Sequence, residues 1–138
     1  MIGLDTNVLA RYYIQDEGDD EAVRQHEAAR RLIESGQPLM VCKTVVLELE
    51  WVMRGYYGFS PLEVASVLRH LLGLPQVSIE DRETVAQAVS CAEEGLDLAD
   101  ALHHASYRSC ERMASFDDRK FARRVKRMGL APGVVIPQ

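Results

Sequence analysis

The chain has 138 residues, of which 47% are hydrophobic and 27% are charged, and its formal net charge is −5. This composition is typical of one soluble globular domain and excludes disordered and fibrous proteins, while the negative charge argues against a protein that simply coats nucleic acid. Three cysteines without a CxxC pair indicate neither a disulfide framework nor a zinc site. No apolar run approaches the ~20 residues that cross a bilayer, and no charged segment of a signal peptide precedes Asp5, so we expect a cytoplasmic protein.

The chain begins with an apolar run, residues 1–4, that leads directly into Asp5, Thr6 and Asn7. Such a run predicts a strand that is covered on both faces, as in a parallel sheet. Ligands of open α/β sheets bind outside the carboxyl ends of the strands, which favours a chemical role for Asp5. The same residue types also cap helices, and Thr6 is a candidate cap for a short helix over 8–13.

Helical and extended patterns alternate along the rest of the chain. Ser60, Pro61 and Glu63 have the spacing of a capping box with proline at the first helical position, and Thr44 is a candidate cap for the helix that follows it. No hairpin signal, repeat or linker interrupts the alternation, so we predict a single domain over residues 1–138 with a parallel sheet flanked by helices. The predicted helices cover 22–34, 45–54, 61–72, a segment from 81 or 83 to 92, 97–107 and 119–128. The further predicted strands cover 38–42, 77–79, 113–116 and 134–136.

Charge is distributed unevenly along the sequence. Acidic residues gather between 16 and 21, and basic residues gather between 119 and 127. The basic segment has two interpretations, a solvated helix face or a surface that contacts a phosphate backbone.

Four acids occupy comparable places in the predicted fold. Asp5 and Asp117 each follow a strand, and Glu48 and Asp100 each lie near the start of a helix. Strand ends and the starts of the following helices share one edge of a parallel sheet, so the four carboxylates can converge there. A cluster of this kind stays ionised only when cations offset the repulsion, and oxygen ligands select Mg²⁺ or Mn²⁺. The pattern therefore predicts a divalent-metal site and phosphodiester hydrolysis.

Each acid also has an alternative role. Asp97 and Asp100 have the spacing of a capping box, and Asp117 or Asp118 is a candidate cap for the last helix. Glu50 is an alternative to Glu48, which we prefer because it shares the predicted inner face of its helix with apolar residues, where an unpaired carboxylate is costly. The adjacent residues His103 and His104 cannot both face one metal from a helix, and we interpret them as surface or packing residues.

Four segments carry the acids, namely Leu4-Asp5-Thr6-Asn7-Val8-Leu9, Val46-Leu47-Glu48-Leu49-Glu50-Trp51-Val52, Leu98-Ala99-Asp100-Ala101-Leu102 and Ser115-Phe116-Asp117. As a set, these segments resemble the motifs of PIN-domain nucleases, and the length and order of the chain resemble the VapC toxins of bacterial toxin–antitoxin pairs. The resemblance implies a PIN-like three-layer α/β/α sandwich with a central parallel sheet of four or five strands. It also implies that Asp5, Glu48, Asp100 and Asp117 coordinate Mg²⁺, or Mn²⁺ as a substitute, and cleave RNA.

The resemblance extends to residues around the acids and to partners. Thr6, Asn7 and Ser115 match polar motif positions and would orient carboxylates or a metal-bound water. Attack by a metal-activated water on an RNA phosphodiester would leave a 5′ phosphate and a 3′ hydroxyl. A homodimer and a VapB-type antitoxin that blocks the acidic site are implied, with operator DNA bound only through the antitoxin. Candidate RNA contacts are Arg11, Arg123, Arg124 and Arg127.

Other protein classes fit the sequence less well. A receiver domain requires an acidic pair near its first strand and a phosphoacceptor Asp near mid-chain, whereas Asp5 has no acidic neighbour and no Asp lies between Asp20 and Asp81. A phosphatase of the haloacid dehalogenase type requires a second Asp where this chain has Asn7. A catalytically silent PIN-like module that only binds an antitoxin or RNA remains the alternative, and the sequence does not identify the RNA target.

Overall fold

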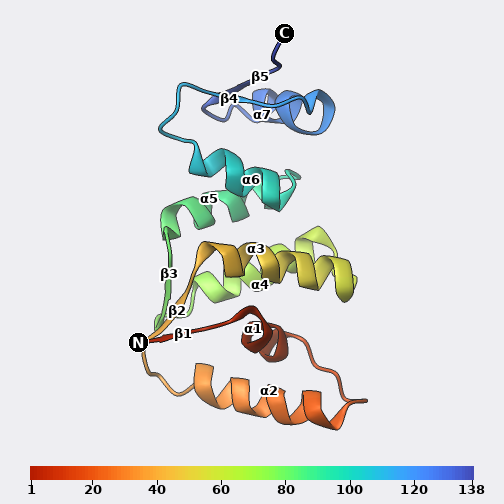
Figure 1. The fold of residues 1–138 in the computed structure, drawn as a ribbon, viewed down its shortest axis with the longest axis vertical. Coiled ribbons are helices and arrows are strands. Elements are labelled where there is room, and N and C mark those ends of the chain that lie inside the picture. Colours follow the sequence, from red (N-terminus) through yellow and green to blue (C-terminus); the bar gives the residue numbers. More distant parts are fainter. The chain divides into compact units, whose positions relative to one another are not determined.

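The structure, a computed structural model, describes residues 1–138, which fall into two compact units, Met1–Arg82 and Glu83–Gln138 (Figure 1). The first unit holds a parallel sheet in the order β1-β2-β3. Ile2 pairs with Leu39, and Leu39 pairs in turn with Val77. The elements of this unit are β1 (Ile2–Gly3), α1 (Thr6–Tyr13), α2 (Asp20–Ile33), β2 (Leu39–Val41), α3 (Lys43–Trp51), the π-helical segment η1 (Val52–Tyr56), α4 (Pro61–Leu72) and β3 (Val77–Ile79).

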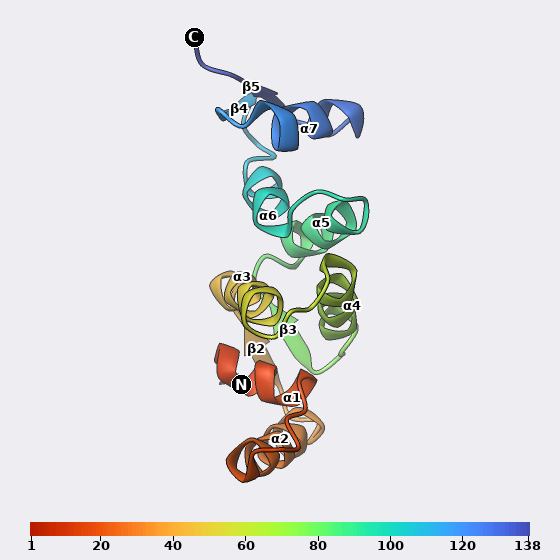
Figure 2. The ribbon, with the colours of Figure 1, turned by 90° about the vertical axis from the view of Figure 1, so that its right-hand side faces the viewer.

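Helices bury the apolar residues of the first unit. Helix α1 packs against both α2 and α3, and α4 packs against β3 and η1 (Figure 2). The fully buried side chains come from strands and helices alike and form one core, which fixes α1 and α3 relative to the sheet. They include Leu9, Ile33, Leu39, Leu49, Met53 and Leu68.

The second unit is built around a smaller parallel pair of strands. Arg112 pairs with Gly133, and α7 packs against η2 and β5. His104 is buried within this unit and its Nε2 lies 2.7 Å from the carbonyl oxygen of Pro132, which confirms its interpretation as a packing residue. The elements are α5 (Arg82–Glu93), α6 (Leu98–Ser106), β4 (Arg112–Ala114), the π-helical segment η2 (Asp118–Ala122), α7 (Arg123–Arg127) and β5 (Gly133–Val135).

The predicted α/β class is confirmed, and every predicted helix and strand has a counterpart. The sheets are small, with three strands in the first unit and two in the second. The capping box of α4 is also confirmed, since Ser60 Oγ accepts the N–H of Glu63 and the Glu63 carboxylate accepts the N–H of Ser60. No helix has the length and apolar content that crossing a bilayer requires.

Two expectations about local structure are wrong. Met1 and Ile2 are exposed, so β1 is not covered on both faces, because it lies at an edge of its sheet and pairs with β2 alone. Thr44 does not cap α3, which begins after Cys42 without a side-chain cap.

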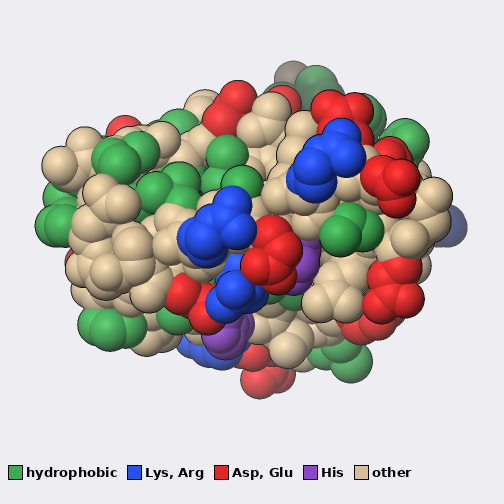
Figure 3. All heavy atoms as spheres, turned by 90° about the horizontal axis from the view of Figure 1, so that it is seen from below, with side chains coloured by type: hydrophobic (Ala, Val, Ile, Leu, Met, Phe, Trp, Pro, Cys, Tyr) green, Lys and Arg blue, Asp and Glu red, His purple; other side chains and the backbone are tan.

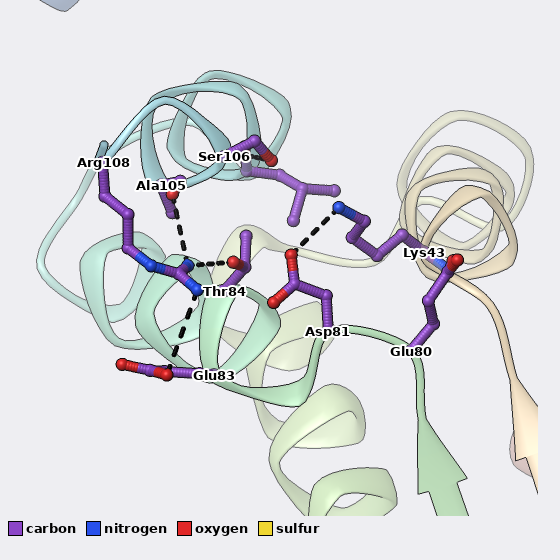
Figure 4. Close-up of polar contacts among 9 residues, drawn as sticks. Lys43, Glu80, Asp81, Glu83, Thr84, Ala105, Ser106 and Arg108 are labelled. Atoms are coloured by element: carbon purple, nitrogen blue, oxygen red, sulfur yellow. Dashed lines mark hydrogen bonds and ion pairs between the residues drawn. The ribbon is translucent and has the colours of Figure 1, made fainter. Parts of the chain in front are cut away.

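A carboxylate from elsewhere in the first unit supplies the missing cap of α3. The N–H of Lys43 donates to Glu80 Oε1 at 2.9 Å, and Lys43 Nζ lies 3.1 Å from Asp81 Oδ2 (Figure 4). A negative charge at a helix N-terminus is favourable because it faces unpaired N–H groups and the positive end of the helix dipole. The end of β3 therefore fixes the start of the helix that carries Glu48.

An arginine links the helices of the second unit in a similar way. Arg108 Nη1 donates to the buried hydroxyl of Thr84 and to the carbonyl oxygen of Ala105, and its Nη2 lies 3.9 Å from Glu83 (Figure 4). Because Thr84 belongs to α5 and Ala105 to α6, these contacts tie the two helices together.

Candidate active site

Thr6 forms hydrogen bonds to the side chains of both Asp5 and Glu48. Asp5 is the N-cap of α1, where its Oδ1 accepts the N–H of Thr6 at 2.8 Å. Thr6 is 5% exposed, and its hydroxyl donates to Glu48 Oε1 on α3. The capping role of Asp5 and a chemical role are compatible, because Asp5 Oδ2 and Glu48 Oε2 have no donor within the protein. Each acid therefore keeps one oxygen available for a ligand.

The prediction that Glu48 lies on the buried inner face of its helix is wrong. Glu48 is exposed, whereas Glu50 is only 4% exposed. Glu50 Oε1 accepts from Arg54 Nε at 2.5 Å, one helical turn later, so its buried charge is paired. Glu50 thus has a structural role, and Glu48 is the acid of α3 that faces a space open to ligands.

Asp5 and Glu48 line the same hollow on the first unit, which has a volume of about 500 Å³. Asn7 lines it beside them, as does Arg11 one helical turn later in α1. Aromatic residues complete the lining, with Trp51 at the end of α3 and Tyr56 and Tyr57 in and after η1. The aromatic lining was not predicted from the sequence, although the only tryptophan of the chain lies five residues before a Tyr-Tyr pair.

The second unit carries the other two predicted acids, Asp100 and Asp117. Asp100 lies in the first turn of α6 and is partly buried, and its N–H donates to Asp97 Oδ1, which caps the helix. Burial raises the pKa of the Asp100 carboxyl, and the negative charges of Asp97 and Asp117 raise it further. Loss of water and like charge both disfavour the ionised form, and a bound cation would relieve both effects.

Asp117 is held at the start of η2 by its neighbours. Its Oδ1 accepts the N–H of Lys120 at 3.0 Å, and its own N–H donates to Ser115 Oγ at 3.1 Å. Asp117 is therefore the N-cap, while Asp118 pairs with Arg123 at 2.8 Å. The hydroxyl of Ser115 thus fixes the backbone that carries Asp117, much as the hydroxyl of Thr6 fixes the side chain of Glu48.

The donor set suits a hard divalent cation. All four predicted ligands are carboxylates, and oxygen ligands are those that Mg²⁺ and Mn²⁺ prefer. Neither unit by itself brings three or more His, Cys, Asp or Glu side chains together in a cluster that could hold a metal. The four predicted ligands fall into one pair in each unit, Asp5 with Glu48 in the first and Asp100 with Asp117 in the second.

Of the four arginines predicted to contact RNA, some already have partners within the protein and others do not. Arg123 is paired with Asp118, and Arg124 donates to the carbonyl oxygen of Gly95 at 2.9 Å, so both have partners within the second unit. Arg127 is exposed and has no such partner. Arg11 donates through Nε to Gln25 Oε1 at 2.7 Å and has no ion pair, which leaves its terminal N–H groups for a ligand of the hollow.

Elsewhere on the first unit, acids of the same segment neutralise Arg30. Arg30 of α2 forms ion pairs with Glu27 and Glu34 at 3.0 and 3.7 Å. Basic and acidic side chains are accordingly intermixed on the face seen from the α2 side, with no large patch of one sign (Figure 3). This face is therefore a poor candidate for binding a phosphate backbone.

An α/β protein with paired carboxylates at strand ends and helix starts belongs to a class that includes many metal-dependent enzymes of phosphate chemistry. Comparison with known families narrows this class. The PIN domain family matches residues 2–127, and the chain is therefore a member of that family. The match continues across the boundary between the two units. PIN domains are generally nucleases and typically use divalent metals. A search of curated proteins found no match to the chain.

Proposed function

We propose that this protein is a metal-dependent endoribonuclease in which Asp5, Glu48, Asp100 and Asp117 supply the ligands for Mg²⁺ or Mn²⁺. One observation carries the proposal: Asp5 and Glu48, which are far apart in the sequence, line one hollow and share Thr6 as a hydrogen-bonding bridge. Membership of the PIN domain family supports it, since those domains are generally nucleases. Both units would then act as a single PIN domain over residues 1–138.

The residues of the chain would position the reaction rather than attack the phosphate themselves. A bound divalent cation lowers the pKa of water and offsets the charge of the phosphate. Thr6 holds Glu48, Ser115 holds the turn at Asp117, and Asn7 and Arg11 offer hydrogen bonds to the substrate. Water adds to the phosphorus as the bond to the 3′ oxygen breaks, and that oxygen leaves with a proton. The products are a 5′ phosphate and a 3′ hydroxyl.

The experiment that tests the proposal is cleavage of total cellular RNA by the purified protein with Mg²⁺, with Mn²⁺ and with a chelator. Asp5→Asn and Asp100→Asn variants are purified in parallel, and Asp16→Asn, at an exposed acid outside the hollow, is the matched control. We expect discrete cleavage by the wild type and Asp16→Asn, and none by the other two variants when circular dichroism shows them folded. Cleavage in the presence of the chelator, or by folded Asp5→Asn, would contradict the proposal.

We further propose that the protein is a VapC-type toxin in a type II toxin–antitoxin pair. The support is that the residues and order of the four motifs, and the length of the chain, resemble those of the VapC toxins. The protein would be cytoplasmic, would form a homodimer and would be held inactive by a VapB-type antitoxin that contacts operator DNA. Induced expression in a heterologous bacterium tests this role: growth arrest by the wild type, and normal growth with Asp5→Asn at equal protein levels, is the expected result. Equal growth with both proteins would contradict it.

A further inference from the structure

Two aromatic residues that line the hollow, Trp51 and Tyr56, are exposed and so contribute little to the buried core. Trp51 is 67% exposed and Tyr56 is 80% exposed, although both side chains are large and largely apolar. Tyr57 supports Tyr56 from one side, with ring centroids 4.8 Å apart at an interplanar angle of 69°. Exposed aromatic residues that line a concave site commonly bind ligands, because their burial by a partner is favourable.

The π-helical turn explains why Trp51 and Tyr56 line the same hollow. In an α-helix, residues three and four apart share a face, whereas residues five apart do not. The segment η1 instead has the wider i→i+5 pattern, as in the bond of 3.2 Å from the N–H of Tyr57 to the carbonyl oxygen of Val52. This widening brings a residue five positions later back to the side of Trp51. Gly55 leaves space beside the indole, whose Nε1 lies 4.0 Å from the position that a Cβ would take.

We propose that Trp51 and Tyr56 are specificity residues of this site, which stack on unpaired bases of the RNA substrate. The proposal rests on the proposed nuclease function and assigns its specificity. The lining of the hollow combines ring faces for bases, the Arg11 guanidinium for a phosphate, and the carboxylates of Asp5 and Glu48. Bases inside a duplex have their faces covered by their neighbours, so only unpaired bases can stack on protein rings.

Electrostatics alone would provide little binding energy for RNA here. The net charge of the chain is −5, and Arg123 and Arg124 are occupied by partners within the protein. Stacking does not depend on charge and tolerates any base, because every base has a π face. The size of the hollow, about 500 Å³, lies within the range of small-ligand sites and accommodates nucleotides rather than a duplex.

Trp51 provides its own reporter because it is the only tryptophan of the chain. The probe is a mixed-sequence RNA about ten nucleotides long, which is added to the full-length protein in EDTA so that no cleavage occurs. The same backbone with abasic sites, and the same RNA annealed to its complement, are the matched controls. We expect the single strand to quench the indole fluorescence, and the abasic and duplex forms to quench it far less. Equal quenching by the abasic strand, or no quenching by the single strand, would overturn the proposal.

Binding of labelled RNA to variants separates stacking from structure. We expect Trp51→Leu to weaken binding roughly 5- to 100-fold, Trp51→Phe to weaken it less, and Leu62→Ala, at an exposed apolar residue of α4 outside the hollow, to leave it unchanged. Equal binding by Trp51→Leu and Leu62→Ala would overturn stacking. This assay contains no metal and measures no cleavage. A negative result would therefore overturn base stacking alone, and the nuclease proposal is tested separately by the cleavage assay.

A second copy of the chain is the competing occupant of this surface. Self-association through Trp51 would shift its emission to shorter wavelength as the protein concentration rises. It would also abolish the quenching by RNA at high concentration. That pair of results would overturn the proposal, whereas emission and quenching that do not depend on protein concentration support it.

Discussion

The Thr6 hydroxyl offers the most direct test of how the first unit holds its two acids. Thr6→Val removes the O–H that donates to Glu48 and keeps the shape of the side chain. A hydrogen bond to a charged group contributes about 1.5–3 kcal/mol, and its loss costs less when water replaces the donor. Because Glu48 is exposed, we expect Thr6→Val to lower the free energy of unfolding by about 1–1.5 kcal/mol. This corresponds to a fall in the melting temperature of about 3–5 °C.

The same substitution has an expected effect on the site. Without Thr6, the Glu48 carboxylate is free to rotate, and loss of an outer hydrogen bond typically weakens metal binding about 10- to 100-fold. Urea unfolding and a Mn²⁺ titration measure the two effects, and Thr6→Ser, which keeps the hydroxyl, should restore both. Thr44→Val is the matched control, because Thr44 is exposed and contacts only Cys42 through its hydroxyl. If Thr6→Val behaves like Thr44→Val in both assays, the bridging role assigned to Thr6 is refuted.

Three further predictions concern stability and charge. Ser60→Ala should destabilise the protein by about 1 kcal/mol in urea unfolding, because it removes the cap of α4; an unchanged midpoint would contradict this role. The folded protein binds the proton of Asp100 more tightly than the unfolded chain, so its contribution to stability falls as the pH rises above the ordinary value of 3.8. Metal-free Asp100→Asn should therefore be more stable than the wild type near neutral pH but not at about pH 4. A variant less stable than the wild type at neutral pH would show that the ionised Asp100 carboxylate does not destabilise the folded protein. Arg127→Ala should lower the slope of log affinity for RNA against log salt by about 1, whereas Arg123→Ala should lower it less because Asp118 already pairs with Arg123; equal slopes for both variants would exclude a distinct role for Arg127.

Local patterns in the sequence predict much of the fold. The capping box at Ser60 and the acids at the start of α2 act within one helical turn, and each lies where the sequence indicates. The cap of α3 could not be predicted in this way. It comes from Glu80, which is 37 residues away from Lys43 in sequence and approaches it only because β3 pairs with β2.

In α3, which carries Glu48, the spacing of apolar residues does not predict which acid is buried. Apolar residues occupy several sides of α3, so the pattern does not define one inner face, and the buried acid is Glu50 rather than Glu48. A local signal was available, because Arg54 follows Glu50 by four residues and pairs with it. The π-helical turn between Trp51 and Tyr56, which line one hollow, has no comparable signature in the sequence.

The measurement that tests the central claim most directly is Mn²⁺ binding followed by electron paramagnetic resonance. The wild type is compared with Asp5→Asn, Glu48→Gln, Asp100→Asn and Asp117→Asn, and with Asp118→Asn as a neighbouring acid that is paired with Arg123. The account predicts that the wild type and Asp118→Asn bind Mn²⁺, and that each of the four other variants binds it at least about tenfold more weakly. Binding by all four variants as tight as that of the wild type would contradict the assignment of these carboxylates as metal ligands.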